Sequence, residues 1–457
     1  MKQTKILGLI ASVVMIMSAC SSNDNSTPPV VPPPPTDTVV TGTLTANKTL
    51  TAGKTWVLKG YVYVPNGIKL TIEAGTRIIS DLGVNKGALC IERGGQIEAI
   101  GTSASPIVFT SGNAAGSKAP GDWGGVVVLG RAPTNRAQTP VIEGGLDRPY
   151  GGTVANDNSG TMKYVRIEYA GIAAFANSEI NALTLGGVGN GTTMENIQTA
   201  YANDDAYEFF GGTVNAKYLV AAYTADDDYD FDFGYVGKIQ YAVSLRDPAF
   251  VDNGDAGNGI ESDNDGSATI VAPFTRPVLS NFTFVGPNGA GNTAPNHNFN
   301  MRWRRSTRFA VANSILMGYA KAGFSIESDA SGQAYKDNVS LFRSNLVHAV
   351  VNPYWIPSTG TPSVPTVNPS IITAAEMRTK AEADGNITYT SASDIKLKQP
   401  FNLTAPDMMP DAGSPALTGA TYTGDFADAF FIQGAFRGAI GATNWLSGWT
   451  RFFANGQ

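Results

Sequence analysis

The stretch Glu195–Val214 reads ENIQTAYANDDAYEFFGGTV, and Lys217–Val236 repeats it as KYLVAAYTADDDYDFDFGYV. An offset of 22 residues pairs Tyr201 with Tyr223, Asp204 with Asp226, Asp205 with Asp227, Tyr207 with Tyr229, Glu208 with Asp230 and Phe209 with Phe231. Short alternating segments that recur at this spacing are typical of a solenoid in which each coil lies on the one before it. The repeat therefore predicts an all-β solenoid.

Further copies extend the repeat in both directions. The segment TMKYVRIEYAG (residues 161–171) matches at an offset of 32, which predicts an insertion in that coil. Residues 64–78 and 93–110 each contain a short alternating strand followed by Gly-Thr, and GIESD (residues 259–263) returns as SIESD (residues 325–329) three periods of 22 later. Successive side chains of a strand point to opposite faces, so we expect the apolar ones to stack in the interior across coils.

The segment ADDDYDFDFGY (residues 225–235) is the most acidic of these strands. Alternation places Asp228, Asp230 and Asp232 on an outer face and Tyr229, Phe231 and Phe233 on the opposite face. The repeat further predicts that Tyr229 and Phe231 stack on Tyr207 and Phe209 of the preceding coil.

The first twenty residues predict export and lipidation. Two lysines precede an apolar run that is too short for a permanent membrane span, which is typical of a signal peptide. It ends in Met-Ser-Ala-Cys, which resembles the lipobox of bacterial lipoproteins, so residues 1–19 are expected to be removed and Cys20 to carry the lipid. Residues 20–42 are polar and then proline-rich, which predicts a disordered tether. Ser21 stands where an aspartate would favour inner-membrane retention, so we expect the outer membrane.

Composition limits the binding partners and the disulfide bonds that this protein could have. The net charge of -6 argues against nucleic acid as a partner. If Cys20 carries lipid, Cys90 has no disulfide partner, and its apolar neighbours predict a small buried core residue. The fold must therefore hold itself by packing and hydrogen bonds.

A resemblance adds the handedness of the coil. The segments LTIEAGT (residues 70–76), GGQIEAIGT (residues 94–102) and GDWGGVVVLGRAP (residues 121–133) resemble right-handed parallel β-helix proteins of the pectate-lyase-like superfamily. The run from WGGVVVLG to the closing FRGAIGATNWLSGWTRF is similar to a family of exported lipoproteins common in the Bacteroidota. The resemblance implies a right-handed parallel β-helix and an exported location, and it implies no particular activity.

These patterns divide the mature chain into two regions. Residues 43–351 are expected to form the β-helix, and residues 352–457 a C-terminal extension and cap. Within the extension, ITAAEMRTKAEADG (residues 372–385) predicts a short amphipathic helix with Ile372, Met377 and Ala381 on one side. The closing apolar stretch (residues 426–453) is expected to shield the last coil, and a surface for docking a partner is the alternative.

The acidic residues of neighbouring coils predict a cation site or a solvated face. Carboxylates one repeat apart are expected about 4.8 Å from each other, where they repel by roughly 3 kcal/mol at an effective dielectric of about 20 and far less in water. Calcium is the natural candidate cofactor because it prefers several oxygen ligands. The candidate metal or ligand residues are Asp204, Asp205, Glu208, Asp226, Asp227, Asp230, Asp232, Glu261 and Asp263.

The hypothesis of an enzyme involves residues of the same coils. Polysaccharide lyases of this fold place calcium on strand carboxylates and use an Arg or Lys as base, and the hydrolases use several aspartates. Candidate bases are Arg246, Arg302, Arg304 and Arg305, and MRWRR offers Arg302, Trp303 and Arg304 for sugar binding, with Trp303 as a platform. The run RAPTNR (residues 131–136) matches the R-x-P-x-x-R string of pectate lyases, but the W-x-D-H motif is missing, and we expect the run to lie away from the acidic coils. His297 is expected to be a turn residue and not a ligand.

Two functions follow as hypotheses. The first is a lipoprotein anchored in the outer membrane through Cys20, on the cell surface or facing the periplasm, whose β-helix binds a glycan or an outer-membrane protein without catalysis. The second is a calcium-assisted polysaccharide lyase or glycoside hydrolase that acts on the acidic coils.

Overall fold

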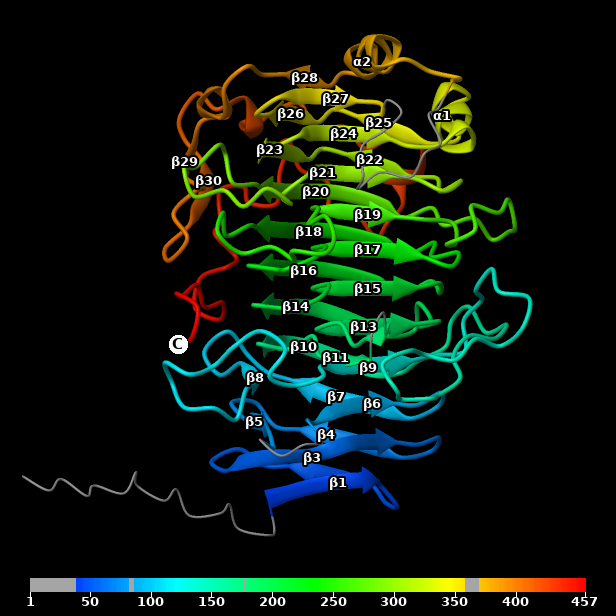
Figure 1. The fold of residues 1–457 in the computed structure, drawn as a ribbon, viewed down its shortest axis with the longest axis vertical. Coiled ribbons are helices and arrows are strands. Elements are labelled where there is room, and N and C mark those ends of the chain that lie inside the picture. Colours follow the sequence, from blue (N-terminus) through cyan, green and yellow to red (C-terminus); the bar gives the residue numbers. More distant parts are fainter. Residues whose placement is uncertain (1–37, 82–85, 176–177, 358–369) are drawn as a thin grey trace, which may run out of the picture. The chain divides into compact units, whose positions relative to one another are not determined.

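The computed structural model describes residues 38–81, 86–175, 178–357 and 370–457. Their strands wind into a right-handed parallel β-helix (Figure 1), and 26 of the strands belong to one continuous sheet. The predicted fold class is confirmed. Cys20 and the signal peptide lie outside the described residues. None of the helices in the described ranges is long and apolar enough to cross a membrane.

The coils form three walls, each a ladder of parallel strands. The first wall contains β2 (Lys48–Leu50), β4 (Lys69–Ile72), β7 (Gln96–Ile100), the first halves of β10 (Gly160–Glu168), β14 (Thr193–Ala200), β16 (Asn215–Ala222), β18 (Lys238–Leu245) and β20 (Val278–Val285), then β22 (Ala310–Ala312) and β25 (Leu341–Arg343). The second wall contains the first halves of β1 (Val39–Thr43) and β3 (Thr55–Val64), β5 (Arg77–Ser80), β8 (Ile107–Thr110), the second halves of β10, β14, β16, β18 and β20, then β23 (Ile315–Tyr319), β26 (Leu346–Ala349) and β28 (Ile387–Thr388).

The third wall carries the acidic strands. It contains the ends of β1 and β3, β6 (Ala88–Ile91), β9 (Val126–Leu129), β13 (Leu183–Gly186), β15 (Tyr207–Phe210), β17 (Tyr229–Asp232), β19 (Ile260–Ser262), β21 (Phe299–Trp303), β24 (Ala322–Ile326) and β27 (Asn352–Trp355). Two antiparallel pairs stand outside the coils: β11 (Ala173–Phe175) with β12 (Ser178–Glu179), and β29 (Leu397–Gln399) with β30 (Asp407–Pro410). Short 3-10 turns cover Ala392–Ile395, Pro415–Leu417 and Gly424–Ala427.

The strand register confirms the central repeat. β15 and β17 pair at an offset of 22 residues, as do β14 and β16, while β10 and β14 pair at the predicted offset of 32. The longer match between GIESD and SIESD is wrong as a register. Glu261 pairs with Arg302, and Arg302 pairs with Ser325, so the intervening coils measure 41 and 23 residues. A long loop between β19 and β21 accounts for the difference.

A row of corner residues joins the first wall to the second. It consists of Tyr164, Asn196, Tyr218, Tyr241 and Asn281, whose φ angles lie between 52° and 62°. This left-handed region is uncommon for residues other than glycine, with Asn enriched in it. Each corner residue interrupts the pairing of a bent strand at the same place in its coil. We call these five residues the corner row.

The two ends of the β-helix differ from the predicted boundaries. β1 begins at Val39, so the solenoid starts before residue 43. β27 continues the third wall and β28 the second wall beyond residue 351. The predicted helix is confirmed as α2 (Ala374–Ala383), which begins with a capping box between Thr373 and Glu376. A second helix, α1 (Asp329–Lys336), follows β24.

The closing stretch does not shield the last coil, so that part of the predicted cap is wrong. α2 lies on top of the stack (Figure 1), with Met377 and Ala381 buried in the main core. The chain then runs back along the side of the solenoid. Residues 431–457, which we call the strap, contact successively earlier coils: Ile432 bonds to Gln240, and Arg451 bonds to Gln198. The apolar residues of the strap therefore cover the outside of the second wall.

Candidate functional site

Two strands of the third wall place aromatic residues inside and carboxylates outside. Tyr207 stacks on Tyr229 with ring centroids 5.1 Å apart and an interplanar angle of 6°, and the rings of Phe209 and Phe231 are also 5.1 Å apart. All four residues are buried in the core, as predicted. Because side chains alternate along a strand, Glu208 of β15 and its register partner Asp230 of β17 point outward.

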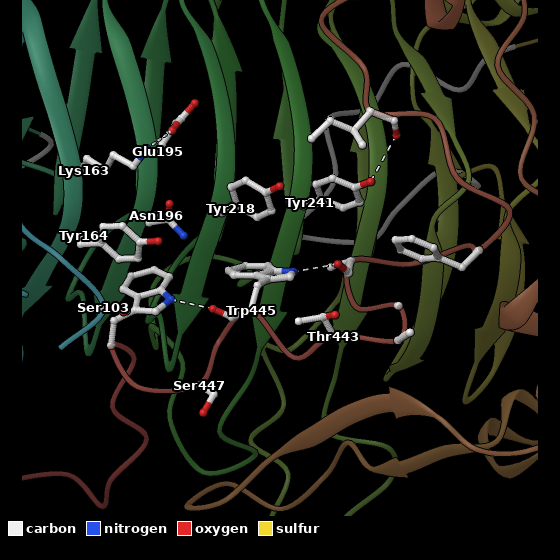
Figure 2. Close-up of a pocket in the computed structure, with 16 residues that line it drawn as sticks. Ser103, Lys163, Tyr164, Glu195, Asn196, Tyr218, Tyr241, Thr443, Trp445 and Ser447 are labelled. Atoms are coloured by element: carbon white, nitrogen blue, oxygen red, sulfur yellow. Dashed lines mark hydrogen bonds and ion pairs between the residues drawn. The ribbon is translucent and has the colours of Figure 1, made fainter.

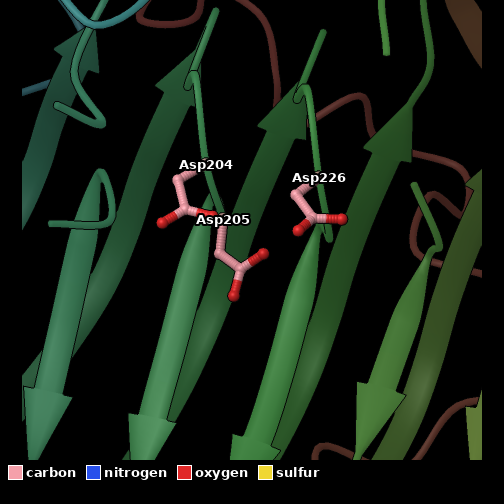
Figure 3. Close-up of side chains that lie close together, drawn as sticks. All are labelled: Asp204, Asp205 and Asp226. Carbon is pink, nitrogen blue, oxygen red and sulfur yellow. The ribbon is translucent and has the colours of Figure 1, made fainter. Parts of the chain in front are cut away.

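The turns that precede these strands add four aspartates. Figure 3 shows Asp204 and Asp205 before β15 directed toward Asp226, which precedes β17 on the next coil. One carboxylate oxygen from each of the three lies within 4.8 Å of the others, and Asp205, Glu208 and Asp230 form a second such group. The backbone N–H of Asp227 donates to Oδ1 of Asp205 at 2.8 Å. The carboxylates of the predicted pairs Asp204–Asp226 and Glu208–Asp230 are thus brought together, whereas Asp227 meets Asp205 through its backbone N–H.

Three members of this cluster are withdrawn from solvent, and the other carboxylates are partly exposed. The exposed fractions of Asp205, Glu208 and Asp227 are 6%, 5% and 4%, so the interpretation as a fully solvated face is wrong for these residues. Burial and, secondarily, the charges of neighbouring carboxylates raise the pKa of Asp204 to about 7. The same causes raise the pKa values of Asp205, Glu208, Asp226, Asp227, Asp230 and Asp232 well above the ordinary value.

Asp228 and Phe233 do not follow the predicted alternation. Asp228 precedes β17, is fully buried, and pairs with Arg246 at 3.1 Å instead of joining the outer face. Phe233 follows β17 with φ near 50° and stacks outside the core on Phe210, with ring centroids 5.4 Å apart. Alternation therefore holds only within the four residues of the strand.

The carboxylates of the next coils are neutralised by arginines. Arg302 pairs with Glu261 at 2.7 Å and with Glu327 at 3.0 Å. Asp263 accepts from Arg304 at 2.8 Å and from Arg305 at 2.6 Å. With Arg246 held by Asp228, all four candidate bases are engaged in ion pairs.

The predicted sugar platform is wrong. Trp303 has no exposed surface and stacks on Phe309 inside the solenoid, with ring centroids 4.6 Å apart. Arg302 is 1% exposed and Arg304 is held by both Glu261 and Asp263. Trp303 lies on the inward-facing side of β21. The local sequence alone does not indicate which face of the strand this residue occupies.

The run from Arg131 to Arg136 lies beside the acidic coils, contrary to prediction. Asn135 N–H donates to the carbonyl of Phe233 at 2.9 Å, and the guanidinium of Arg136 lies 4.5 Å from the centre of the Phe233 ring. The segment that follows β9 leaves the solenoid and extends along the stack, so closeness in sequence to an early coil does not fix its position.

A groove of about 670 Å³ lies between the corner row and the strap. Figure 2 shows Tyr164, Asn196, Tyr218 and Tyr241 side by side along one side of the groove, with Trp445 facing them from the strap. The remaining lining residues are Ser103, Lys163, Glu195, Ile432, Phe436, Ala439, Gly441, Ala442, Thr443, Ser447 and Trp449. Six of the sixteen lining residues are therefore aromatic, and most of the others are polar or small.

The aromatic rings of the groove are fixed by contacts with each other and with the backbone. The ring of Trp445 lies edge-on to Tyr218 at 5.2 Å, and Trp449 lies edge-on to Tyr164 at 5.8 Å. Tyr218 stacks on Tyr241 at 5.3 Å. Each tryptophan donates its indole N–H to a carbonyl of the strap at 2.8 Å. Tyr164, Tyr218 and Trp445 remain partly exposed, so their rings are accessible from the groove.

The sequence contains one signal for this groove. Tyr164, Asn196, Tyr218 and Tyr241 occupy the same position of four successive coils, one residue after Lys163, Glu195, Lys217 and Gln240. An aromatic or amide residue repeated at a polar position indicates a surface row. The strap residues opposite carry no such periodicity.

The comparison with known families covers most of the chain. The family described as "Pectate-lyase like beta helix domain" matches residues 42–392. No curated protein matches the chain. No solved structure matches it either. The matched range includes the acidic cluster and the corner row, while the strap lies beyond it.

Proposed function

Because the chain belongs to the pectate-lyase-like β-helix family, we propose that it is an exported, lipid-anchored protein that binds a glycan in the groove between the corner row and the strap. The observation that carries the proposal is the accessible pair of Tyr218 and Trp445 at the centre of the groove. Sugar rings present apolar C–H faces and a rim of hydroxyl groups, which suits aromatic platforms edged by polar side chains. Lys163, Glu195 and Thr443 supply such polar groups.

The cellular location of the protein is part of the proposal. The lipobox-like Met-Ser-Ala-Cys supports lipidation of Cys20, and Ser21 supports the outer membrane, with the β-helix held at the cell surface by the proline-rich segment. Metabolic labelling with a palmitate analogue should mark the wild-type protein and leave Cys20→Ala unmarked. Protease treatment of intact cells should degrade the protein. Protection from the protease would place it on the periplasmic face.

Binding and turnover are measured on the same samples of full-length protein. A panel of neutral polysaccharides and polyuronates is tested for binding, and for new reducing ends or unsaturated products, with and without Ca²⁺. We expect retention on a subset of glycans without products. Failure to bind any glycan, together with co-purification of an outer-membrane protein, would replace the glycan by a protein partner.

A polysaccharide lyase or hydrolase is the second candidate, favoured by the clustered carboxyls of Glu208 and Asp230. A raised pKa suits a carboxyl group that acts as a general acid, and burial raises the pKa values of both groups. Product formation that Glu208→Gln abolishes would establish this candidate over binding alone. The engagement of Arg246, Arg302, Arg304 and Arg305 in ion pairs favours the non-catalytic function.

A further inference from the structure

On the outer face of the third wall, the carboxylates of one coil are paired with arginines, whereas, among the described residues, those of the two preceding coils are not. Glu261, on the rung after Asp230, is paired with arginines, as is Asp263. Across the described residues, no ion pair reaches Asp205, Glu208 or Asp230. The same wall thus contains one set of carboxylates with built-in cations and an adjacent set without them.

Several oxygens of the second set lack hydrogen-bond partners. Oε1 of Glu208 and Oδ1 of Asp230 are buried and receive no hydrogen bond from the described residues, and Oδ1 of Asp226 shares this state. Glu208 is only 5% exposed, so water has little access to it. Leaving a buried polar group without a hydrogen-bond partner destabilises the folded protein, and more so when the group is charged. Unpartnered oxygens that converge from two coils indicate a ligand that supplies positive charge.

The spacing of the oxygens suits a metal ion. One oxygen from each of Asp205, Glu208 and Asp230 lies within 4.8 Å of the other two. Calcium binds oxygen at about 2.3–2.6 Å, so oxygens on a shared ion are separated by up to roughly 5 Å. The N–H of Asp227 donates to Oδ1 of Asp205 at 2.8 Å, which fixes the position of that carboxylate beside the group.

We propose that Asp205, Glu208 and Asp230 bind one hard divalent cation of the calcium class, which joins the coils of β15 and β17. The ion takes the place that Arg302 and Arg304 occupy on the following coils. It completes the coordination of oxygens that the chain leaves unpartnered and removes the repulsion between adjacent rungs. Asp204 and Asp226 stand next to the ion through their shared neighbour Asp205.

The test uses the full-length protein after treatment with EDTA and exchange into metal-free buffer. Addition of Ca²⁺ should raise the melting temperature in a saturable manner, because an ion that binds only the folded state stabilises it. Calorimetric titration should give one site. No binding and no change in melting temperature on addition of Ca²⁺, Mg²⁺ or Mn²⁺ would overturn the proposal.

Variants locate the ion. Glu208→Gln and Asp230→Asn should each abolish the Ca²⁺-dependent rise, whereas the control Glu98→Gln, which alters a partly exposed carboxylate paired with Lys69 at 3.8 Å, should keep it. Binding that survives both substitutions would place the cation elsewhere and overturn the assignment. If a variant does not fold, Tb³⁺ bound to the wild-type protein provides the second measurement. Its luminescence, sensitised by Tyr207 and Tyr229 on the same rungs, should be lost on addition of Ca²⁺; absence of sensitised emission would count against this location. No glycan enters these measurements, so they can fail or succeed independently of the proposed function.

Discussion

Arg246 donates a hydrogen bond to Asp228 across 3.1 Å inside the solenoid, and neither side chain has any exposed surface. The other oxygen of Asp228 accepts from the hydroxyl groups of Ser244, at 2.5 Å, and Tyr319, at 3.1 Å. The pair therefore ties the end of β18 to the turn before β17 and to a later coil. A charge buried this deeply is stable only while its partners are present.

Removal of Arg246 should destabilise the protein strongly. Arg246→Met leaves the charge of Asp228 buried without a cation, and breaking a buried pair in this way costs about 3–5 kcal/mol. Urea denaturation followed by circular dichroism measures the loss. Arg378→Met, which removes an exposed ion pair with Glu382, should leave the midpoint unchanged. The double variant Arg246→Met with Asp228→Leu should recover part of the loss; equal stability of the single variant and the wild type would contradict a structural role for the pair.

The stacked rings of the third wall should dominate the stability of the central coils. Phe231→Ala removes a fully buried ring that packs on Phe209 and Tyr235. Truncation of a buried phenylalanine costs about 3–5 kcal/mol, and the same denaturation measurement applies. Phe401→Ala, at a side chain that is 37% exposed, is the matched control and should have little effect. A similar, small loss of stability in both variants would show that the aromatic stack does not dominate the stability of the central coils.

The fold and its aromatic stack could be predicted because both depend on local alternation and on the repeat length. Once Tyr229 is aligned with Tyr207, the period of two fixes which residues point inward. The direction of the Asp228 side chain could not be predicted from alternation because this residue lies before β17, where the backbone turns. A repeat gives the spacing between strands, but it does not give the residue at which a strand begins.

The groove and the neutralising arginines could not be predicted because they depend on long-range contacts. Trp445 reaches Tyr218 only because the strap returns along the solenoid, and no periodicity links these two residues. The pairing of Arg302 with Glu261 follows from a coil of 41 residues, which the period of 22 could not indicate. The acidic cluster was found from sequence because its residues belong to adjacent copies of the repeat.

Trp445 of the groove should contribute directly to binding. Trp445→Ala removes the ring that faces Tyr218, and we expect the affinity for the bound glycan to fall about tenfold, which corresponds to about 1.4 kcal/mol. Isothermal titration of the wild-type and variant proteins with that glycan measures the change. Trp445→Phe should retain part of the affinity because an aromatic face remains, and Phe401→Ala, outside the groove, should retain all of it. Unchanged affinity in Trp445→Ala would move the binding site away from the groove.

His297 should remain neutral over the physiological pH range. His297 is fully buried and its Nε2 lies 3.0 Å from the carbonyl oxygen of Asp247. Burial lowers its pKa to about 3, with a smaller contribution from the charge of Arg246. The chain contains only two histidines, and burial also lowers the pKa of His348. In NMR spectra recorded between pH 8 and pH 5, the ring proton signal of His297 should not shift, and a His348→Gln variant assigns the two signals.

The same shift predicts the direction of one contribution to acid stability. An unfolded histidine binds a proton near pH 6.5, whereas native His297 binds one only near pH 3. Between these values the unfolded state holds more protons, so the free energy of unfolding falls as the pH decreases, by up to about 1.4 kcal/mol per pH unit. His297→Gln removes this titration, so the stability of the wild type relative to the variant should decline below pH 6.5. A difference that stays constant with pH, or a histidine signal that titrates near pH 6.5, would show that His297 is open to solvent in the native protein.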